Sequence, residues 1–122
     1  MEFRLEMVSV PVANVQRAME FYVERLGFTV EQDIEVDDTH RFVELTPPGS
    51  SCSIALTSGF MDARPGSLQG TQLNVDDVDA ARAHLAACGV DVSAVQEFPW
   101  GRFCFFSDSD GNDWSVHEVQ PS

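Results

Sequence analysis

The sequence contains no lysine: all seven basic residues are arginine, and they stand against 20 acidic residues. The resulting formal net charge of -13 at pH 7 repels phosphate groups and anionic lipid. Cysteine is also scarce, because Cys52, Cys88 and Cys104 are odd in number, far apart and without CxxC spacing. These shortages argue against nucleic acid as a partner, and they indicate neither a disulfide framework nor a thiolate metal site.

Long hydrophobic runs are absent as well. No segment approaches the roughly 18 consecutive apolar residues that span a bilayer. The first residues, MEFRLEMVSVPV, lack the basic region and the apolar run of an export signal. A chain of 122 residues can nevertheless bury a core of its own. We therefore expect a single soluble domain over residues 1–122 that resides in the reducing cytoplasm and contacts no membrane.

Two segments of the sequence share one pattern. VANVQRAMEFYVERLGFTV begins at Val12, and VDDVDAARAHLAACGVDV begins at Val75, an offset of 63. Each predicts a capped helix, because Asn14 and Asp77 can accept hydrogen bonds from first-turn amides and a glycine follows the last turn. Strand candidates follow both helices, so the chain reads as two βαβββ modules joined by a linker. First module, linker and second module cover about residues 1–58, 59–69 and 70–122.

The linker carries two apolar residues between helix breakers, Phe60 and Met61. Apolar side chains exposed in this way are often covered by a protein partner. We expect them to be buried in the second subunit of a homodimer.

The segment SDSDGNDWSVHEV, residues 107–119, crowds three aspartates and an asparagine around Gly111. A calcium loop of the helix-loop-helix kind needs glycine at its sixth position and glutamate at its twelfth. Counting from Asp108, glycine is fourth and the twelfth residue is Val119. The aromatic and β-branched flanks instead favour two strands joined by a tight turn at Asp110-Gly111. We interpret this segment as a hairpin.

Together these motifs resemble the vicinal oxygen chelate superfamily, which includes glyoxalase I, bleomycin-resistance proteins and extradiol dioxygenases. The resemblance covers nearly the whole sequence and is carried by VSVPVANVQRAMEFYVERLGF, VDDVDAARAHLAACGV and FSDSDGNDWSVHEV. The last segment is similar to the family's DPDGN turn, with Ser109 in place of proline. The resemblance implies an α+β fold: two βαβββ modules form a curved, eight-stranded mixed sheet, with helices on its convex side and a ligand in its concave cavity.

Metal-dependent members of this superfamily hold four ligands, one from the first and one from the last strand of each module. The resemblance places these positions at Met7, Ser53, Gly70 and Ser115. A thioether, two hydroxyls and a glycine do not replace the imidazole and carboxylate ligands that such a site needs. We therefore expect no metal and no other cofactor.

Alternation along the strands predicts a polar cavity lining. Val8, Val10 and Val12 share a face suited to packing under helices. The opposite face carries polar and mostly uncharged residues, namely Ser9, Ser53, Thr57, Gln72, Asn74, Ser115 and His117. As a set, these residues predict a hydrogen-bonding pocket for a small molecule.

Four residues are further candidates for the site. His117 is the only histidine expected inside the pocket, which makes it a candidate general base, or else a histidine hydrogen-bonded for structure. Arg41 and Arg102 are candidate anion clamps at the rim, or else partners in surface salt bridges. Trp100, in the segment FPWGRF (98–103), is a candidate aromatic anchor, with core packing of that segment's phenylalanines as the alternative.

Three functions are compatible with these observations. The first is a metal-free small-molecule binding protein, similar to the bleomycin-resistance branch and acting as a homodimer. The second is a metal-dependent lyase or dioxygenase with displaced ligands, for instance His117 with Glu44 or Glu118. The third is a metal-free enzyme that uses His117 as its base. The fold hosts many chemistries, so the sequence does not identify the ligand.

Overall fold

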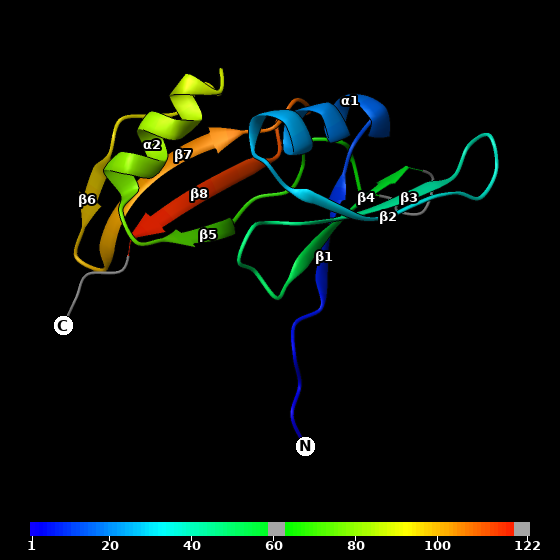
Figure 1. Cartoon of the computed structure of the whole chain (residues 1–122), viewed down its shortest axis with the longest axis horizontal. Helices are drawn as coiled ribbons and strands as arrows, with labels where there is room; N and C mark the ends of the chain where they lie inside the picture. The colour runs from blue at the N-terminus through cyan, green and yellow to red at the C-terminus, as the bar shows by residue number, and fades with distance from the viewer. Residues whose placement is uncertain (59–62, 119–122) are drawn as a thin grey trace.

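The computed structural model describes residues 1–58 and 63–118 (Figure 1). Two βαβββ units follow one another, as predicted, and the α+β class is confirmed. The first unit contains β1 (Met7–Pro11), α1 (Val15–Met19) with its π-helical continuation η1 (Glu20–Arg25), β2 (Thr29–Glu35), β3 (Arg41–Thr46) and β4 (Ser53–Ser58). The second contains β5 (Thr71–Val75), α2 (Val78–Ala87), β6 (Gln96–Phe98), β7 (Gly101–Ser107) and β8 (Asp113–Glu118). Phe60 and Met61 lie outside the described residues, so their expected burial stays a prediction.

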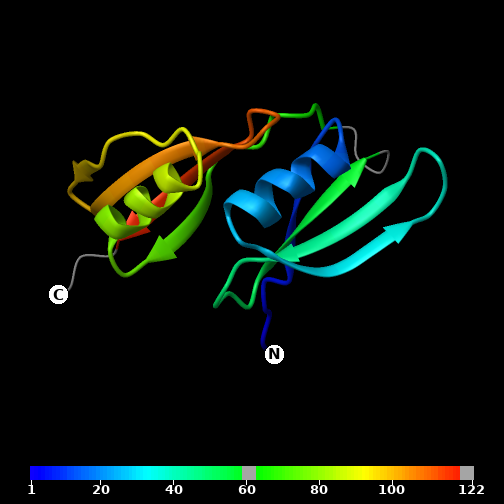
Figure 2. The same cartoon turned by 45° about the horizontal axis from the view of Figure 1, so that its top comes forward.

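The eight strands are divided between two sheets of four. Their orders are β1-β4-β3-β2 and β5-β8-β7-β6. In each sheet the first and last strands of the unit are parallel neighbours, and the other pairs are antiparallel. Over the described ranges, no strand of one sheet is hydrogen-bonded to a strand of the other. Figure 1 shows the units side by side with both helices on the same side, and the turned view of Figure 2 shows each helix lying across its own sheet.

Both helices begin where the sequence predicts. The side chain of Asn14 accepts a hydrogen bond from the Arg17 amide at 3.0 Å, and that of Asp77 accepts one from the Ala80 amide at 3.1 Å. These bonds satisfy amides that a helix leaves unpaired at its start. The glycine that ends each helix has a positive φ, which is typical of this position.

The core lies between the helices and the sheets and continues from one unit into the other. A single cluster of buried apolar side chains combines Val10 and Leu56 of the first sheet with Cys104 and Val116 of the second. Tyr22, on η1, is fully buried within it. The two units therefore fold around shared apolar contacts.

The aspartate-rich turn is a hairpin, as predicted, and it also joins the two units. Its buried Asp108 accepts hydrogen bonds from the Tyr22 hydroxyl at 2.6 Å, from the Asn112 side chain at 2.8 Å and from two amides of its own turn. The indole N–H of Trp114 donates to the Tyr22 oxygen at 2.9 Å, and the Asn112 side chain donates to the Pro11 carbonyl at 3.0 Å. Burial, reinforced by the Asp108 charge, raises the pKa of Tyr22 well above its ordinary value.

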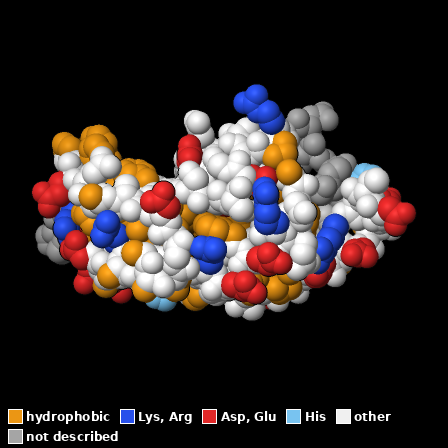
Figure 3. Space-filling model, turned by 90° about the horizontal axis from the view of Figure 1, so that it is seen from above, with side chains coloured by type: hydrophobic (Ala, Val, Ile, Leu, Met, Phe, Trp, Pro, Cys, Tyr) orange, Lys and Arg blue, Asp and Glu red, His pale blue; other side chains and the backbone are white. Residues whose placement is uncertain are grey.

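All three cysteines are free thiols. Over residues 1–58 and 63–118, none of the helices has both the length and the apolar character that crossing a bilayer requires. Figure 3, which looks down on the helix side, shows acidic side chains spread over this face with basic side chains between them.

Candidate functional site

The face of the first sheet that points away from α1 is polar, as the alternation predicted. Ser9 and Ser53 lie on it, in line with Met7, because β1 and β4 are paired with Met7 opposite Ser53 and Ser9 opposite Ala55. The hydroxyls of Ser53 and Thr46 are hydrogen-bonded at 2.8 Å. Side chains on this face therefore satisfy part of each other's hydrogen bonding, and the Glu44 carboxylate, opposite Ala55, lies on the same face.

Thr57 also lies on the first sheet, opposite Phe42, and the corresponding face of the second sheet brings together the remaining four predicted polar residues. Gln72 lies opposite Ser115, and Asn74 lies opposite His117, on the paired strands β5 and β8. These residues therefore form a compact polar group along two neighbouring strands.

Aromatic rings from β6, β7 and the turn between them continue this face. Phe103 stacks on the His117 imidazole with ring centroids 4.4 Å apart and on Phe105 at 6.1 Å. Phe98 stacks on Trp100 at 5.4 Å and meets Phe103 edge-on at 5.6 Å. We call these five residues, Phe98, Trp100, Phe103, Phe105 and His117, the aromatic face. Parallel rings held in this way offer flat surface to another flat ring.

Much of the aromatic face is open to solvent. Trp100 is 68% exposed, Phe98 37% and Phe105 36%, whereas Phe103 beneath them is 5% exposed. Sequence reasoning identified Trp100 as an anchor but left the segment's phenylalanines open and overlooked Phe105. The signal was present in RFCFF, where residues 103 and 105 share one face of a strand while 104 and 106 point into the core.

His117 is held from both sides of its ring. Its Nε2 lies 3.3 Å from the carbonyl oxygen of Trp100, and its Nδ1 lies 3.3 Å from the side-chain nitrogen of Gln72. The Gln72 oxygen in turn accepts a hydrogen bond from the Ser115 hydroxyl at 3.1 Å. With both ring nitrogens engaged, the arrangement matches the structural alternative for His117 better than a free general base.

Both candidate anion clamps are bound to acidic residues of their own unit. Arg41 donates to Asp33 at 2.8 Å and to Gln16 of α1 at 3.2 Å, and Arg102 donates to Asp79 of α2 at 2.9 Å. These contacts hold both guanidinium groups on the helix sides of their sheets, away from the aromatic face. These ion pairs agree with the salt-bridge alternative, and the clamp role stays a prediction.

The four inferred metal-ligand positions are only partly brought together. Met7 lies opposite Ser53, but Ser115 faces Gln72 and not Gly70, which precedes β5. The second sheet is thus paired two residues away from the alignment that the motifs suggested. Within residues 1–58 and 63–118, no three His, Cys, Asp or Glu side chains are grouped so that they could hold a metal ion.

The displaced ligand sets also do not assemble. Glu118 alternates with His117 along β8, and its carboxylate accepts a hydrogen bond from the Val78 amide at the start of α2. Glu44 belongs to the first sheet, where it accepts a hydrogen bond from Gln32 at 3.0 Å. Neither glutamate lies beside the His117 imidazole.

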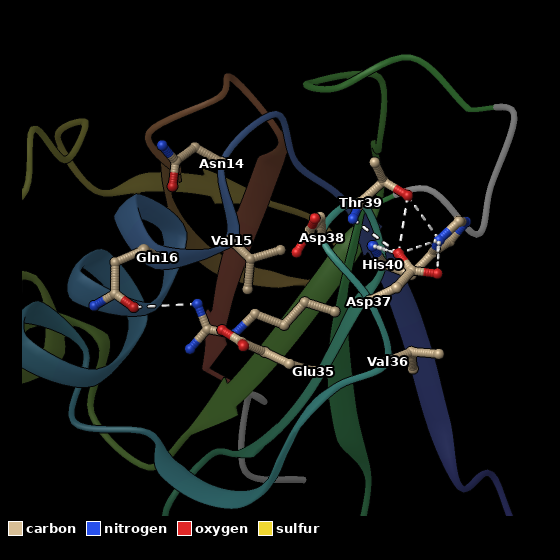
Figure 4. Close-up of a pocket in the computed structure, with 10 residues that line it drawn as sticks. Asn14, Val15, Gln16, Glu35, Val36, Asp37, Asp38, Thr39 and His40 are labelled. Carbon is tan, nitrogen blue, oxygen red and sulfur yellow. Dashed lines mark hydrogen bonds and ion pairs between the residues drawn. The ribbon is translucent and has the colours of Figure 1, made fainter.

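Among the hollows of the described residues, two that lie outside the aromatic face include predicted site residues. One, of about 450 Å³, separates the units and is lined by Ser53, Gln72 and Trp114 among others. The other, of about 520 Å³, lies between the start of α1 and the β2–β3 hairpin (Figure 4). Its wall includes Asp37, whose pKa is lowered to about 2 by the hydrogen bond from His40. This acidic wall also includes Arg41, one of the two candidate anion clamps, but none of the predicted polar lining.

Comparison with known proteins now gives the family. The family model described as Glyoxalase/Bleomycin resistance protein/Dioxygenase superfamily matches residues 4–116. The chain belongs to this superfamily. The crystal structure of TnmS3, an antibiotic binding protein from Streptomyces sp. CB03234, is similar with a TM-score of 0.88 and 37% identity over 98% of both chains. A superfamily member from Sphaerobacter thermophilus has a TM-score of 0.85 and 32% identity, covering 97% of this chain and 98% of its own.

The chain is also similar to a protein with a curated sequence. The uncharacterized protein YaeR of Escherichia coli (strain K12) is 31% identical over 107 residues, which covers 80% of this chain and 82% of YaeR. Superfamily membership fixes the fold. It does not identify the ligand.

Proposed function

We propose that the protein binds a small molecule containing a planar aromatic ring, without a metal ion, on the aromatic face. The observation that carries this proposal is the pair of stacked, solvent-exposed rings of Phe98 and Trp100 beside the stack of Phe105, Phe103 and His117. Three large aromatic side chains that stay exposed do not contribute the stabilising free energy of burial. Exposed apolar patches of this kind commonly mark binding sites.

Two further observations support this function. TnmS3 is an antibiotic binding protein, and it is similar to this chain over nearly the full length of both. The net charge of -13 disfavours anionic ligands, whereas the polar residues beside the rings are uncharged or weakly basic. We infer a neutral or cationic aromatic ligand and a role in sequestering it, in the cytoplasm, where the three free thiols stay reduced.

Titration with daunorubicin, a planar cationic aromatic antibiotic whose fluorescence changes on stacking, tests the proposal. We expect saturable binding that weakens about tenfold in Trp100→Ala and in Phe105→Ala, because each substitution removes a stacking surface. Val36→Ala is the matched control, since Val36 is an exposed apolar residue of the other unit. Equal binding by all four proteins would refute a site on the aromatic face.

We also propose that the protein is a homodimer in which a second copy covers the open side of the aromatic face. Over the described residues of one chain, the exposed rings lie on Phe103 as a floor and have no opposite wall. A binding site that buries most of a ligand needs both. Sedimentation velocity at micromolar concentration should give the mass of two chains, and a mass of one chain would refute the dimer.

A further inference from the structure

The polar edge of the aromatic face is a chain of three hydrogen bonds that runs in one direction. It starts at the Ser115 hydroxyl, passes through the Gln72 amide and the His117 imidazole, and ends at the Trp100 carbonyl, with lengths of 3.1, 3.3 and 3.3 Å. The donor at each step follows from chemistry, because a carbonyl oxygen only accepts and an amide nitrogen only donates.

These constraints assign the proton of His117. The Trp100 carbonyl requires a hydrogen on Nε2, and the Gln72 NH₂ group requires a lone pair on Nδ1. Both demands are met by one neutral tautomer, with the proton on Nε2. Gln72 is then oriented with its oxygen toward Ser115, and this oxygen accepts the Ser115 hydrogen. Each hydrogen-bonding group in this series thereby fixes the orientation of its neighbour.

The direction of these hydrogen bonds decides whether Ser115 can donate a hydrogen bond to a ligand or only accept one. Its only hydrogen is directed to Gln72, so the oxygen has lone pairs and no donor left for a molecule above it. If His117 gains a second proton, Gln72 can turn its oxygen to Nδ1 and its nitrogen to Ser115. The Ser115 hydrogen then points to the Thr71 carbonyl, 3.5 Å away, and its oxygen remains an acceptor.

We propose that this site selects aromatic ligands that carry a hydrogen-bond donor, such as a hydroxyl or amino group on the ring, placed over Ser115. This inference rests on the proposed function and specifies its ligand class. The rings of the aromatic face bind the ligand's flat surface, and Ser115 distinguishes donors from acceptors. A ligand that presents only an acceptor there faces the lone pairs of Ser115 and loses affinity.

Two fluorescent probes that differ only at this group test the selection. 2-Naphthol carries a donor, and 2-methoxynaphthalene carries an acceptor of similar shape. We expect 2-naphthol to bind about fivefold more tightly to the parent protein, which corresponds to one ordinary hydrogen bond. Ser115→Ala should abolish the difference, because it removes the acceptor for 2-naphthol and the lone pairs that 2-methoxynaphthalene faces. Ser115→Thr, which keeps the hydroxyl, should retain it, and so should Ser67→Ala, an exposed loop serine used as the control.

The outcomes separate this inference from the proposed function. Equal affinities in the parent, or a preference that survives Ser115→Ala, would overturn the donor selection while leaving aromatic binding in place. Failure of both probes and of daunorubicin to bind would overturn the proposed function and the selection with it.

The histidine tautomer gives a test that needs no ligand. Nitrogen-15 spectra of histidine-labelled protein at neutral pH should show His117 protonated at Nε2 and bare at Nδ1, with His40→Gln and His84→Gln assigning the three rings. Gln72→Glu replaces the donor beside Nδ1 with an acceptor and should draw a proton onto Nδ1. A parent His117 protonated at Nδ1 at neutral pH would overturn the assigned direction of the chain.

Discussion

Gly101 lies directly against the imidazole of His117, so that a methyl group in place of its hydrogen would overlap Nε2 of that ring. Its φ of +152° also falls in a region that side chains rarely adopt. This close approach lets the imidazole reach the Trp100 carbonyl and hold the turn that carries the indole. Gly101 is visible in the segment FPWGRF, but its contact with His117 joins residues 16 positions apart, so no local sequence pattern predicts it.

Gly101→Ala should therefore impair stability and ligand binding together. We expect the free energy of unfolding to fall by about 2 kcal/mol, as overpacked sites do. We also expect the affinity for daunorubicin to fall about tenfold, because the displaced turn moves Trp100. Gly49→Ala is the control: Gly49 has a φ of +81° but open space around it, so only backbone strain is introduced. Urea unfolding and fluorescence titration measure both quantities, and parental binding in Gly101→Ala would contradict this role.

At the scale of the elements, helices, caps and strand faces were predictable because each depends on neighbouring residues. Asn14 and Asp77 cap helices through bonds that span three residues. The pairing of β5 with β8 was not predictable to the residue, because the strands are more than 30 positions apart and a shift of two residues leaves every side chain on the same face. The alternation therefore identified Gln72 and Ser115 correctly as members of one face, while the motif alignment paired Ser115 with Gly70.

The contact between η1 and the β7–β8 hairpin gives the second prediction. Tyr22→Phe removes the hydrogen bond to the Asp108 carboxylate and leaves the Trp114 indole N–H without its acceptor. We expect the free energy of unfolding to decrease by about 2 kcal/mol, as is usual for a bond to a charged group. Phe28 packs beside Tyr22 with ring centroids 5.6 Å apart, and its side chain makes no hydrogen bond. Phe28→Leu is therefore a control for lost packing alone.

The raised pKa of Tyr22 makes this contribution dependent on pH. The folded state holds the phenol proton more tightly than the unfolded chain does, so the stabilisation is fully present below about pH 10 and declines as the pH rises further. The parent should lose stability above that pH more steeply than Tyr22→Phe. Tyr22 is the single tyrosine, so tyrosinate absorbance reports it alone. Absorbance that appears near pH 10 while circular dichroism still shows folded protein would contradict the buried bond.

At the scale of the whole molecule, one core links the two units while the surface carries a large excess of negative charge. The ion pairs that organise part of this surface, such as Arg41 with Asp33 and Arg102 with Asp79, engage two of only seven basic residues. Most carboxylates therefore have no basic partner available to them. Composition alone established this imbalance, because it does not depend on how the chain folds.

Screening of this charge should stabilise the fold. The folded state brings 13 uncompensated negative charges closer together than the unfolded chain does, and salt shortens the range of their repulsion. We expect the free energy of unfolding in urea to rise by about 1 kcal/mol between about 20 mM and about 300 mM NaCl. Asp38→Asn with Asp76→Asn, two exposed positions, lowers the net charge to -11 (-13 + 2) and should raise stability at low salt while reducing the salt effect. The charge-conserving pair Asp38→Glu and Asp76→Glu should behave like the parent. If all three proteins respond equally to salt, repulsion at these two positions does not cause the salt effect on stability. If the free energy of unfolding keeps rising toward molar salt, where screening is already complete, adaptation to salt explains the acidic composition better.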